Sequence, residues 1–459
     1  MIKSVSILGL RGFATKQTLE LAIPNGQPGS GLTIVVGANN AGKSTTIEAL
    51  RALGVAQDMS FTAGKRNHKA GDRIELSLTA TNDETAALKS VAPGSSETER
   101  GGAHRGKAKI LAIPSRRAFA PYFGKSEYNR DAYRGHNPSQ ARPLTSDTFS
   151  YRLFKALKNQ KEFNEILARV IDPVPTWTID QDDNNQYFVK ISMEGATHTS
   201  EGAGEGFVSL LFLIDALYDS AEQELIAFDE PELSLHPSVQ RRLSRLMMEY
   251  AATRQIVVAT HSPYFANVDA LNAGGRIVRS FRADSGCELA HLSVETGKRL
   301  YKASLDANNP HMMGLDAREV FFMDDKIIIV EGQEDVMFLD KALASIDQKL
   351  NGSMFGWGAG GAEKIELLAQ VFSELGFKKV VGFVDANKHE LLPSLRGRFK
   401  NYFFEAIPAD DIRTKPAVKA RDARPGLLDD DNKSVRQQHL EAFTAVTKAA
   451  NLYFDKKAQ

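Results

Sequence analysis

Residues 37–46 of the chain read GANNAGKSTT, which is the spacing of a loop that binds phosphate. An apolar run, GLTIVVG, precedes the loop, and a helical pattern, STTIEALRAL, follows it. Glycines in such a loop let backbone N–H groups approach the phosphates, the lysine neutralises the β and γ oxygens, and the serine ligates Mg²⁺. The sequence therefore predicts a strand, an ATP-binding loop and a helix, in that order. The residues predicted to bind ATP here are Gly37, Asn40, Gly42, Lys43, Ser44 and Thr45.

Length and composition indicate a globular protein of several domains. The chain has 459 residues, enough for two or three domains of roughly 100–200 residues each. Lysine plus arginine and aspartate plus glutamate both number 57, so the net charge gives no sign of a nucleic-acid partner. The single cysteine, Cys287, excludes an internal disulfide and fits a reducing cytoplasm.

The apolar segments predict neither a membrane span nor a signal peptide. No apolar run approaches the roughly 18 residues of a spanning helix, and FVSLLFLIDAL is interrupted by Asp215, which favours a buried helix. The opening, MIKSVSILGLRGF, lacks a long apolar core and alternates as a strand does. We therefore expect a cytoplasmic protein with no membrane partner.

Apolar runs alternate with helical patterns at both ends of the chain, which predicts an α/β fold in two domains. The segment VAPGSSETERGGAHRGKAKI is rich in Gly, Ser and charge, and part of it is expected to be a mobile loop. A helical pattern, FSYRLFKALKNQKEFNEILARVI, and strand-like WTIDQ and QYFVKISM follow. We predict a first domain at 1–300 with a helical and loop insertion at about 62–200, a linker at 301–325 and a second domain at 326–459.

Two further strand ends carry residues suited to ATP hydrolysis. The apolar strand in ELIAFDEPELSLHP ends at Asp229, which can hold Mg²⁺ through water, and Glu230 next to it can orient or deprotonate the attacking water. The strand in QIVVATHSP ends at His261, which can hydrogen-bond the γ-phosphate. Taken alone, a solvated acidic pair and an ordinary strand-end histidine are the simpler interpretations. Their order after the phosphate loop favours catalytic roles for Glu230 and His261.

A glycine-rich turn opens a long helix in SEGAGEGFVSLLFLIDAL, and Gly204 and Glu205 there would face an anion. In this order the four elements resemble the ATP-binding cassette (ABC-type) ATPases, specifically the branch with the RecF, Rad50 and SMC heads and the overcoming-lysogenization-defect (OLD) nucleases. DEPELSLHP and the opening SILGLRGF are similar to segments of that branch. The resemblance implies ATP bound between two heads, hence a homodimer or higher oligomer. Ala203 stands where the family has serine, which implies slow hydrolysis.

The last third of the chain places carboxylates at strand ends. DKIIIVEGQEDVMFLDKAL is an apolar strand ending in Glu331, followed by a helix with Glu334 and Asp335, and KKVVGFVDANKHE ends in Asp385. The intervening pattern predicts a small parallel sheet, whose carboxyl edge binds ligands. Carboxylates from two strands can converge on Mg²⁺, which prefers oxygen ligands, and a metal so held can activate water for phosphodiester cleavage.

This second domain resembles the Toprim domain of topoisomerases, primases and OLD nucleases. IPADDIRTK is similar to its third acidic segment, with Asp410 and Asp411 as candidates, and Lys415 or Lys433 would be the family's lysine. The resemblance implies that Glu331, Asp385 and Lys415 are catalytic, and that Mg²⁺ or Mn²⁺ is bound. The predicted metal ligands are Ser44 and Asp229 in the first domain and Glu331, Glu334, Asp335, Asp385 and Asp411 in the second.

One position departs from the Toprim pattern and leaves the function open. The family shows Asp-x-Asp, whereas this chain reads Asp385-Ala386-Asn387, so one metal site is weakened. The basic segments LRGRFKNYFFEA, HRGKAK and SRR are candidates for a DNA surface, and solvated faces are an equal alternative. We expect an ATP-gated, metal-dependent DNA endonuclease or nicking enzyme of anti-phage defence. The alternatives are an ATP-switched scaffold that docks an effector or trigger protein, and a RecF-like repair ATPase.

Overall fold

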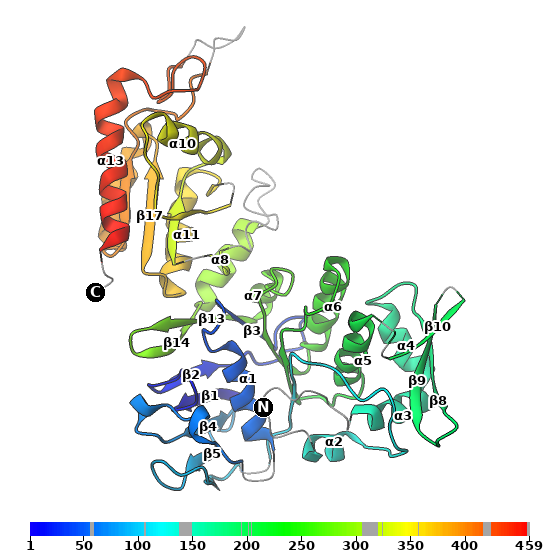
Figure 1. The fold of residues 1–459 in the computed structure, drawn as a ribbon. Helices are drawn as coiled ribbons and strands as arrows, with labels where there is room; N and C mark the ends of the chain where they lie inside the picture. Colours follow the sequence, from blue (N-terminus) through cyan, green and yellow to red (C-terminus); the bar gives the residue numbers. More distant parts are fainter. Residues whose placement is uncertain are drawn as a thin grey trace. The chain divides into compact units, whose positions relative to one another are not determined.

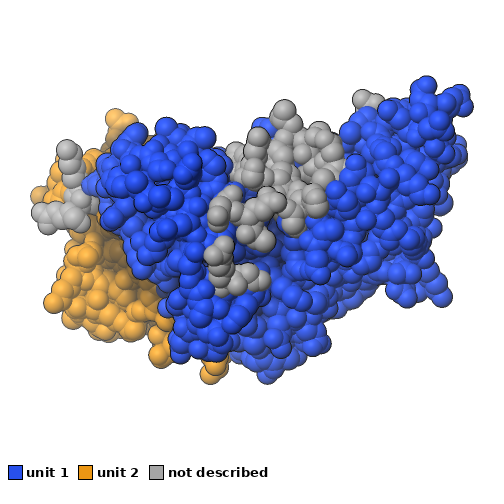
Figure 2. All heavy atoms as spheres, turned by 90° about the horizontal axis from the view of Figure 1, so that it is seen from below, with its two compact units in different colours: residues 1–291 blue, residues 292–459 orange. Residues whose placement is uncertain are grey.

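The computed structural model describes residues 1–55, 59–104, 107–136, 149–193, 195–200, 202, 204–304, 320–323, 325–356, 358–415 and 424–456. The chain divides into two compact units, Met1–His291 and Leu292–Gln459, which Figure 2 shows in blue and orange. The predicted boundary near residue 300 falls inside helix α8 (Val294–Ser304), which belongs to the second unit. Most of the predicted linker 301–325 lies outside the described residues.

A six-stranded sheet forms the centre of the first unit, in the order β14-β13-β3-β12-β11-β7. All its neighbours pair in parallel except the β13–β14 hairpin. The middle strands β3, β11 and β12 are buried along their whole length, which is why their sequences are continuously apolar. The strands are β3 (Leu32–Val36), β7 (Ile110–Ile113), β11 (Leu225–Asp229), β12 (Gln255–Ala259), β13 (Arg276–Ala283) and β14 (Gly286–His291).

A second, antiparallel sheet of this unit has the order β2-β1-β4-β5-β6. Helix α1 (Lys43–Gly54) contacts strands of both sheets, and its apolar residues share one core with them (Figure 1). The strands are β1 (Ile2–Leu8), β2 (Gln17–Glu20), β4 (Glu75–Ala80), β5 (Thr85–Ser90) and β6 (Thr98–Gly101).

The segment predicted as an insertion differs from that prediction in its first half. Residues 75–101 are three strands of the antiparallel sheet, and β7 is an edge strand of the central sheet. Within the glycine- and serine-rich stretch, residues 98–101 form β6 and pair with β5, so a strand interrupts the described part of the stretch. The glycines and charged residues made the alternation of buried and exposed side chains hard to recognise in the sequence. This alternation places Leu88 of β5 and Thr98 of β6 on one buried face.

The second half of that segment packs on helix α5 (Glu205–Tyr218), whose burial confirms the predicted buried helix. The predicted long helix breaks at Asn159 into two, and both predicted strands are confirmed in a three-stranded antiparallel sheet. The elements are α2 (Arg130–His136), α3 (Ser150–Lys158), α4 (Gln160–Ala168), β8 (Thr176–Gln181), β9 (Tyr187–Met193) and β10 (Ala196–Thr199). Short helices η1 (Ala63–Lys65) and η2 (His68–Ala70), α6 (Pro237–Tyr250) and α7 (Asp269–Ala273) complete the unit.

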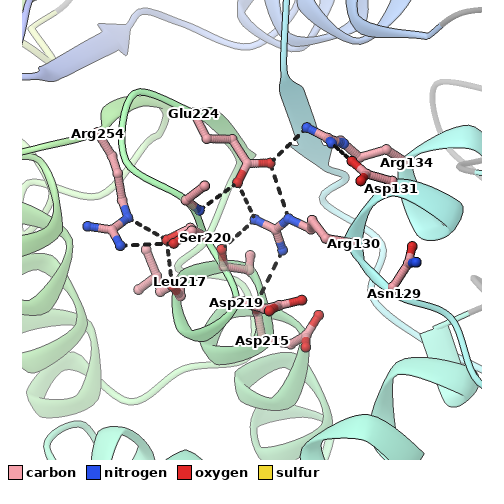
Figure 3. A network of polar contacts seen from close by, with 12 residues as sticks. Asn129, Arg130, Asp131, Arg134, Asp215, Leu217, Asp219, Ser220, Glu224 and Arg254 are labelled. Carbon is pink, nitrogen blue, oxygen red and sulfur yellow. Dashed lines mark hydrogen bonds and ion pairs between the residues drawn. The ribbon is translucent and has the colours of Figure 1, made fainter.

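Buried arginines attach α2 to the end of α5 (Figure 3). Arg130 donates to the Glu224 carboxylate at 3.2 Å and to the backbone carbonyl of Ala216 at 2.8 Å, and Arg134 reaches the same carboxylate at 3.3 Å. The Arg130 guanidinium thus satisfies a carbonyl of the last turn of α5, where a positive charge also offsets the helix dipole.

The second unit contains the predicted parallel sheet, in the order β16-β15-β17-β18. Helices α10 and α13 (Figure 1) share one core with β15 and β17. On α11, the Cγ2 atom of Ile365 lies 3.7 Å from the position that a Cβ on Gly382 of β17 would take, so α11 also packs on this sheet. The elements are β15 (Lys326–Ile329), α10 (Gln333–Ser345), β16 (Ser353–Met354), α11 (Ala362–Glu374), β17 (Lys379–Val384), η5 (Ala386–Leu391), α12 (Leu392–Arg398), β18 (Phe403–Ala406) and α13 (Gln437–Asp455). Within the described part of the chain, no helix is both long and apolar enough to cross a membrane.

Candidate functional site

The phosphate loop lies between β3 and α1, at the carboxyl edge of the central sheet. Gly42 immediately precedes α1 with a φ of 107°, and Gly37 has a φ of 145°, both in the region that favours glycine. A Cβ on Gly37 would lie 2.0 Å from the carbonyl oxygen of Ser280. The glycines are thus required by conformation and by close packing, and the loop presents the N-terminus of α1 to an anion.

Lys43 and Ser44 connect this loop to two other strand ends. The Lys43 Nζ donates to the carbonyls of Gly37 at 2.9 Å and Ala38 at 3.0 Å, and it lies 2.7 Å from Nε2 of His261. The Ser44 hydroxyl donates to Oδ1 of Asp229 at 2.9 Å. A hydroxyl and a carboxylate side by side at a phosphate loop are oxygen donors that fit the Mg²⁺ of Mg·ATP.

Glu230 and His261 lie next to each other beside Lys43. The Oε1 of Glu230 is 3.8 Å from Nε2 of His261, and both side chains are partly exposed. Burial, and next the Lys43 ammonium, lower the pKa of His261, so the imidazole is neutral at neutral pH. Because Lys43 has only donors, the 2.7 Å contact makes Nε2 the acceptor and places the ring proton on Nδ1.

One cavity of about 750 Å³ collects most of the predicted ATP residues. Its volume is within the range of small-molecule sites in general. Residues of the loop, Glu230 and His261 share its wall with charged side chains that were not predicted to bind ATP, one of them Arg116 of the basic segment SRR. The lining includes Asn40, Gly42, Lys43, Ser44, Thr45, Glu230 and His261 together with Arg11, Glu48, Arg116 and Arg282.

The predicted anion-binding turn before α5 does not line this cavity. Glu205 lies on a neighbouring cavity of about 540 Å³, where its carboxylate accepts from the Ser234 hydroxyl at 2.9 Å. Gly204 directly precedes α5, and Ala203 lies outside the described residues. Within one chain, the structure therefore does not bring Gly204 and Glu205 to the phosphate loop.

Buried Arg117 and partly buried Glu232 hold the backbone of the site, and neither was among the predicted site residues. Arg117 donates to the carbonyls of Asp229 at 3.1 Å and Glu230 at 3.0 Å, although its SRR segment was predicted as a basic surface. Glu232 accepts from the backbone N–H of His261 at 2.7 Å. Burial raises the pKa of Glu232. The third acid of DEPEL was a visible signal for Glu232, whereas Arg117 had none.

In the second unit, Glu331, Asp335 and Asp385 gather at the carboxyl ends of β15 and β17. Glu331 Oε1 accepts from the backbone N–H of Asp385 at 2.7 Å, and Asp335 Oδ2 accepts from that of Gly332 at 2.8 Å. Burial, and next the neighbouring carboxylates, raise the pKa of Asp385 to about 8. Burial raises the pKa of Asp335 to about 7 and also raises that of Glu331, in both cases with added repulsion from neighbouring acids.

The other predicted residues of this edge form ion pairs. Lys415 pairs with Asp411 and, at 3.1 Å, with Glu334, which also pairs with Arg413. Lys433 lies on the surface, 3.9 Å from Asp431, so only Lys415 of the two candidate lysines joins the acidic residues.

The amide of Asn387 and the acidic residues of this edge do not form a ready metal site. The Asn387 side chain donates to the carbonyl of Asp410 at 2.9 Å. The acidic oxygens are the ligand type that Mg²⁺ prefers. In the described part of the chain, however, no three His, Cys, Asp or Glu side chains are arranged to hold one ion. The predicted metal set therefore does not fit a shared ion in this arrangement.

The predicted basic segment near residue 398 is largely neutralised. Arg396 pairs with Glu405 at 2.8 Å, and Arg398 pairs with Glu366. These pairs favour a solvated, mixed-charge face over a phosphate-binding surface.

Comparison with known proteins identifies the class of the first unit. Residues 4–84 match a family model described as an AAA domain, and residues 90–267 match one described as "AAA domain, putative AbiEii toxin, Type IV TA system". The N-terminal unit therefore contains AAA-type ATPase domain sequence, which indicates ATP hydrolysis and implies ATP, typically with Mg²⁺. No curated protein matches the chain.

Solved structures similar to the chain include three SMC heads, each less than 15% identical to it. An SMC head bound to the C-terminal winged-helix domain of ScpA is 14% identical, with a TM-score of 0.46 over 65% of this chain and 99% of its own. The SMC head from Thermotoga maritima is 12% identical, with a TM-score of 0.39 over 64% of this chain and 99% of its own. An SMC head from Pyrococcus furiosus has an extended coiled coil and is bound to the C-terminal domain of ScpA. It is 13% identical, with a TM-score of 0.44 over 66% of this chain and 98% of its own.

Proposed function

We propose that this protein is an ATP-hydrolysing DNA endonuclease or nicking enzyme of the OLD type, whose second unit carries the cleaving centre, and that it acts in anti-phage defence. The first part of the proposal assigns roles in hydrolysis. Lys43 binds the β and γ oxygens, and Ser44 and Asp229 hold the Mg²⁺ that accompanies ATP. These are the residues whose atoms meet at the phosphate loop.

Glu230 and His261 then act on the γ-phosphate. Glu230 orients or deprotonates the attacking water, and its position next to Asp229 supports that role. His261 hydrogen-bonds the γ-phosphate and senses whether it is present. A neutral imidazole with a lowered pKa supports this role, because it adds no positive charge next to Lys43 in the absence of ATP.

A second copy of the chain completes the ATP site in this proposal. Gly204 and Glu205 would contact the ATP bound to the other copy, so that ATP holds a homodimer together. Their separation from the phosphate-loop cavity of their own chain supports this arrangement. Ala203 in place of the family's serine supports slow turnover, so that bound ATP mainly holds the two copies together and is hydrolysed slowly.

The carboxylate cluster of the second unit is the single observation that carries the nuclease proposal. Partly buried carboxylates that raise one another's pKa are costly to hold together, and such clusters occur where function requires them. Lys415 beside Asp411 and Glu334 adds a cation for a phosphate or leaving oxygen. Cleavage is expected to require Mg²⁺ or Mn²⁺, and an ion shared by these acids requires their side chains to rearrange.

An ATP-switched scaffold that docks an effector protein is the second candidate. The side chain of Asn387 favours it, because this amide replaces a carboxylate and already donates to Asp410. So does the lack of a ready metal arrangement among the described residues. In this candidate the second unit keeps the fold and has lost catalysis.

One experiment separates the two candidates. Purified protein is incubated with supercoiled plasmid and Mg²⁺ or Mn²⁺, with and without ATP, beside Glu331→Ala, Asp385→Ala and Lys43→Ala. The nuclease proposal predicts that the wild type nicks the plasmid and that both acidic variants abolish nicking while ATP hydrolysis continues. It also predicts that Lys43→Ala abolishes ATP binding and alters nicking. No nicking above background by the wild-type dimer with Mn²⁺ would exclude the nuclease and leave the scaffold.

A further inference from the structure

Arg117 occupies a buried position just beyond the end of β7, while its neighbour Arg116 is exposed. Its guanidinium makes four hydrogen bonds. Nε donates to the Ser209 hydroxyl at 2.6 Å, and Nη1 donates to the carbonyls of Pro114 at 3.0 Å and Asp229 at 3.1 Å. Nη2 donates to the carbonyl of Glu230 at 3.0 Å.

These bonds continue the link between β7 and β11 past the point where the strands stop pairing. The last residues paired between β7 and β11 are Ile113 and Phe228, so the ladder on this side does not reach Asp229 or Glu230, although Asp229 pairs with Ala259 of β12 on the other side. Glu230 has a φ of 48°, a conformation that is uncommon for a residue other than glycine. Its N–H donates to the carbonyl of Ala259 at 2.8 Å, so Arg117 holds one side of this peptide and β12 the other.

The Ser209 bond extends the same group to α5. Ser209 is buried on α5, one turn after Glu205 at the start of that helix. One guanidinium thus contacts both the helix that begins at the predicted anion-binding turn and the backbone of the predicted catalytic carboxylate. A planar fork can serve these diverging acceptors at once, whereas an ammonium on a flexible stem cannot hold the same geometry.

We propose that Arg117 is a positioning residue for ATP hydrolysis, which fixes the backbone of Glu230 and couples it to α5. The inference rests on the proposed function, because it takes Glu230 as the residue that acts on the attacking water. In this arrangement, contact of Gly204 and Glu205 with a nucleotide shifts α5, and Arg117 transmits the shift from Ser209 to Glu230. Hydrolysis then responds to engagement of the helix, whereas nucleotide binding does not depend on it.

The test compares Arg117→Lys and Ser209→Ala with a matched control, Arg254→Lys. Arg254 also donates through Nε to a serine hydroxyl, that of Ser220 at 2.6 Å, and through Nη2 to a backbone carbonyl at 2.9 Å, away from the cavity. ATP affinity, kcat, KM and melting temperature are measured for each. We expect Arg117→Lys to lower kcat at least tenfold with Kd within threefold, and Ser209→Ala to lower kcat by threefold or more. The control variant Arg254→Lys should keep the kcat and the Kd of the wild type.

A double variant distinguishes positioning from a general structural role. Because Arg117 acts through Glu230, adding Arg117→Lys to Glu230→Gln should not lower the residual turnover further. Independent losses that multiply, or a folded Arg117→Lys with the wild-type kcat, would overturn the inference. If Arg117→Lys does not fold, Ser209→Ala decides, and an unchanged kcat there excludes the coupling. A wild-type protein without ATP turnover would instead overturn the proposed function itself.

Discussion

The ammonium group of Lys43 lies 2.7 Å from Nε2 of His261, so the phosphate loop and the end of β12 meet at one hydrogen bond. Glu232 fixes the other side of this contact, because its carboxylate binds the backbone N–H of His261 and the hydroxyl of Thr260. A γ-phosphate that reaches Lys43 therefore also reaches a histidine whose backbone is held in place.

Replacing His261 should affect turnover more than binding. His261→Ala is expected to keep the Kd for ATP within about tenfold, roughly 1.4 kcal/mol, because Lys43 and the loop remain. The ATP turnover should fall by a much larger factor, since the group that contacts the γ-phosphate is lost. Calorimetry and steady-state phosphate release measure the two quantities. A parallel loss of binding and turnover would make His261 a structural residue.

Replacing Glu230 should separate ATP binding from hydrolysis. Glu230→Gln retains the size and shape of the side chain and one acceptor oxygen but cannot accept a proton from water. We expect it to bind ATP, to hydrolyse little of it and to accumulate as a dimer. Light scattering after gel filtration, with and without ATP, measures the dimer. Turnover equal to that of the wild type would remove Glu230 from catalysis.

The acidic cluster of the second unit should make stability depend on pH. Asp335 and Asp385 have pKa values raised to about 7 and about 8, from an ordinary 3.8, so the folded chain holds their protons more tightly than the unfolded chain. Their contribution is thus fully present only below about pH 4 and is lost progressively as the pH rises from the unfolded pKa of 3.8 to the folded pKa of about 7 to 8. The melting temperature of the wild type should therefore fall between about pH 4 and pH 8 more than that of Asp385→Asn.

Divalent cations provide the control for that prediction. An ion bound by the cluster offsets the repulsion between ionised carboxylates. Mg²⁺ at high pH should therefore raise the melting temperature of the wild type and have less effect on Asp385→Asn. Identical pH profiles of the two proteins would show that Asp385 does not titrate in this range.

Asn387→Asp should restore the second carboxylate of the Toprim pattern. In the nuclease proposal, the added charge strengthens attraction for a cation, so nicking should increase or its Mg²⁺ requirement should fall. A plasmid assay over a Mg²⁺ titration measures both. Asn387→Ala is the matched control, since it removes the amide that donates to Asp410 without adding charge. Equal nicking by both variants at every Mg²⁺ concentration would assign the effect to the lost hydrogen bond.

Local patterns were sufficient to predict several parts of this molecule. The loop before Lys43, the buried helix α5 and the parallel strands ending near Glu331 and Asp385 each follow from a short run of residues. Spacing also placed Asp229 and His261 at strand ends, and the structure brings both to Lys43 and Ser44.

Features that depend on distant contacts were not predictable in this way. Arg116 and Arg117 are adjacent and chemically identical, yet only the second is buried, because the ends of β7 and β11 and helix α5 surround it. The strand β7 was assigned to an insertion for the same reason, since its partner β11 comes more than a hundred residues later.

The order in which the chain builds its central sheet has a consequence for synthesis on the ribosome. The apolar strand β3 pairs only with β12 and β13 among the described strands, and the backbone N–H of Ile2 is bound by Gln255, which is 253 residues away. Most of the ATPase unit must therefore emerge before its first buried strand has a partner. At about 5–20 residues per second, that wait is on the order of ten seconds or more. Throughout it, this apolar strand lacks its partners and is open to chaperones, and nascent chains cut short before β12 would lack the middle of the central sheet.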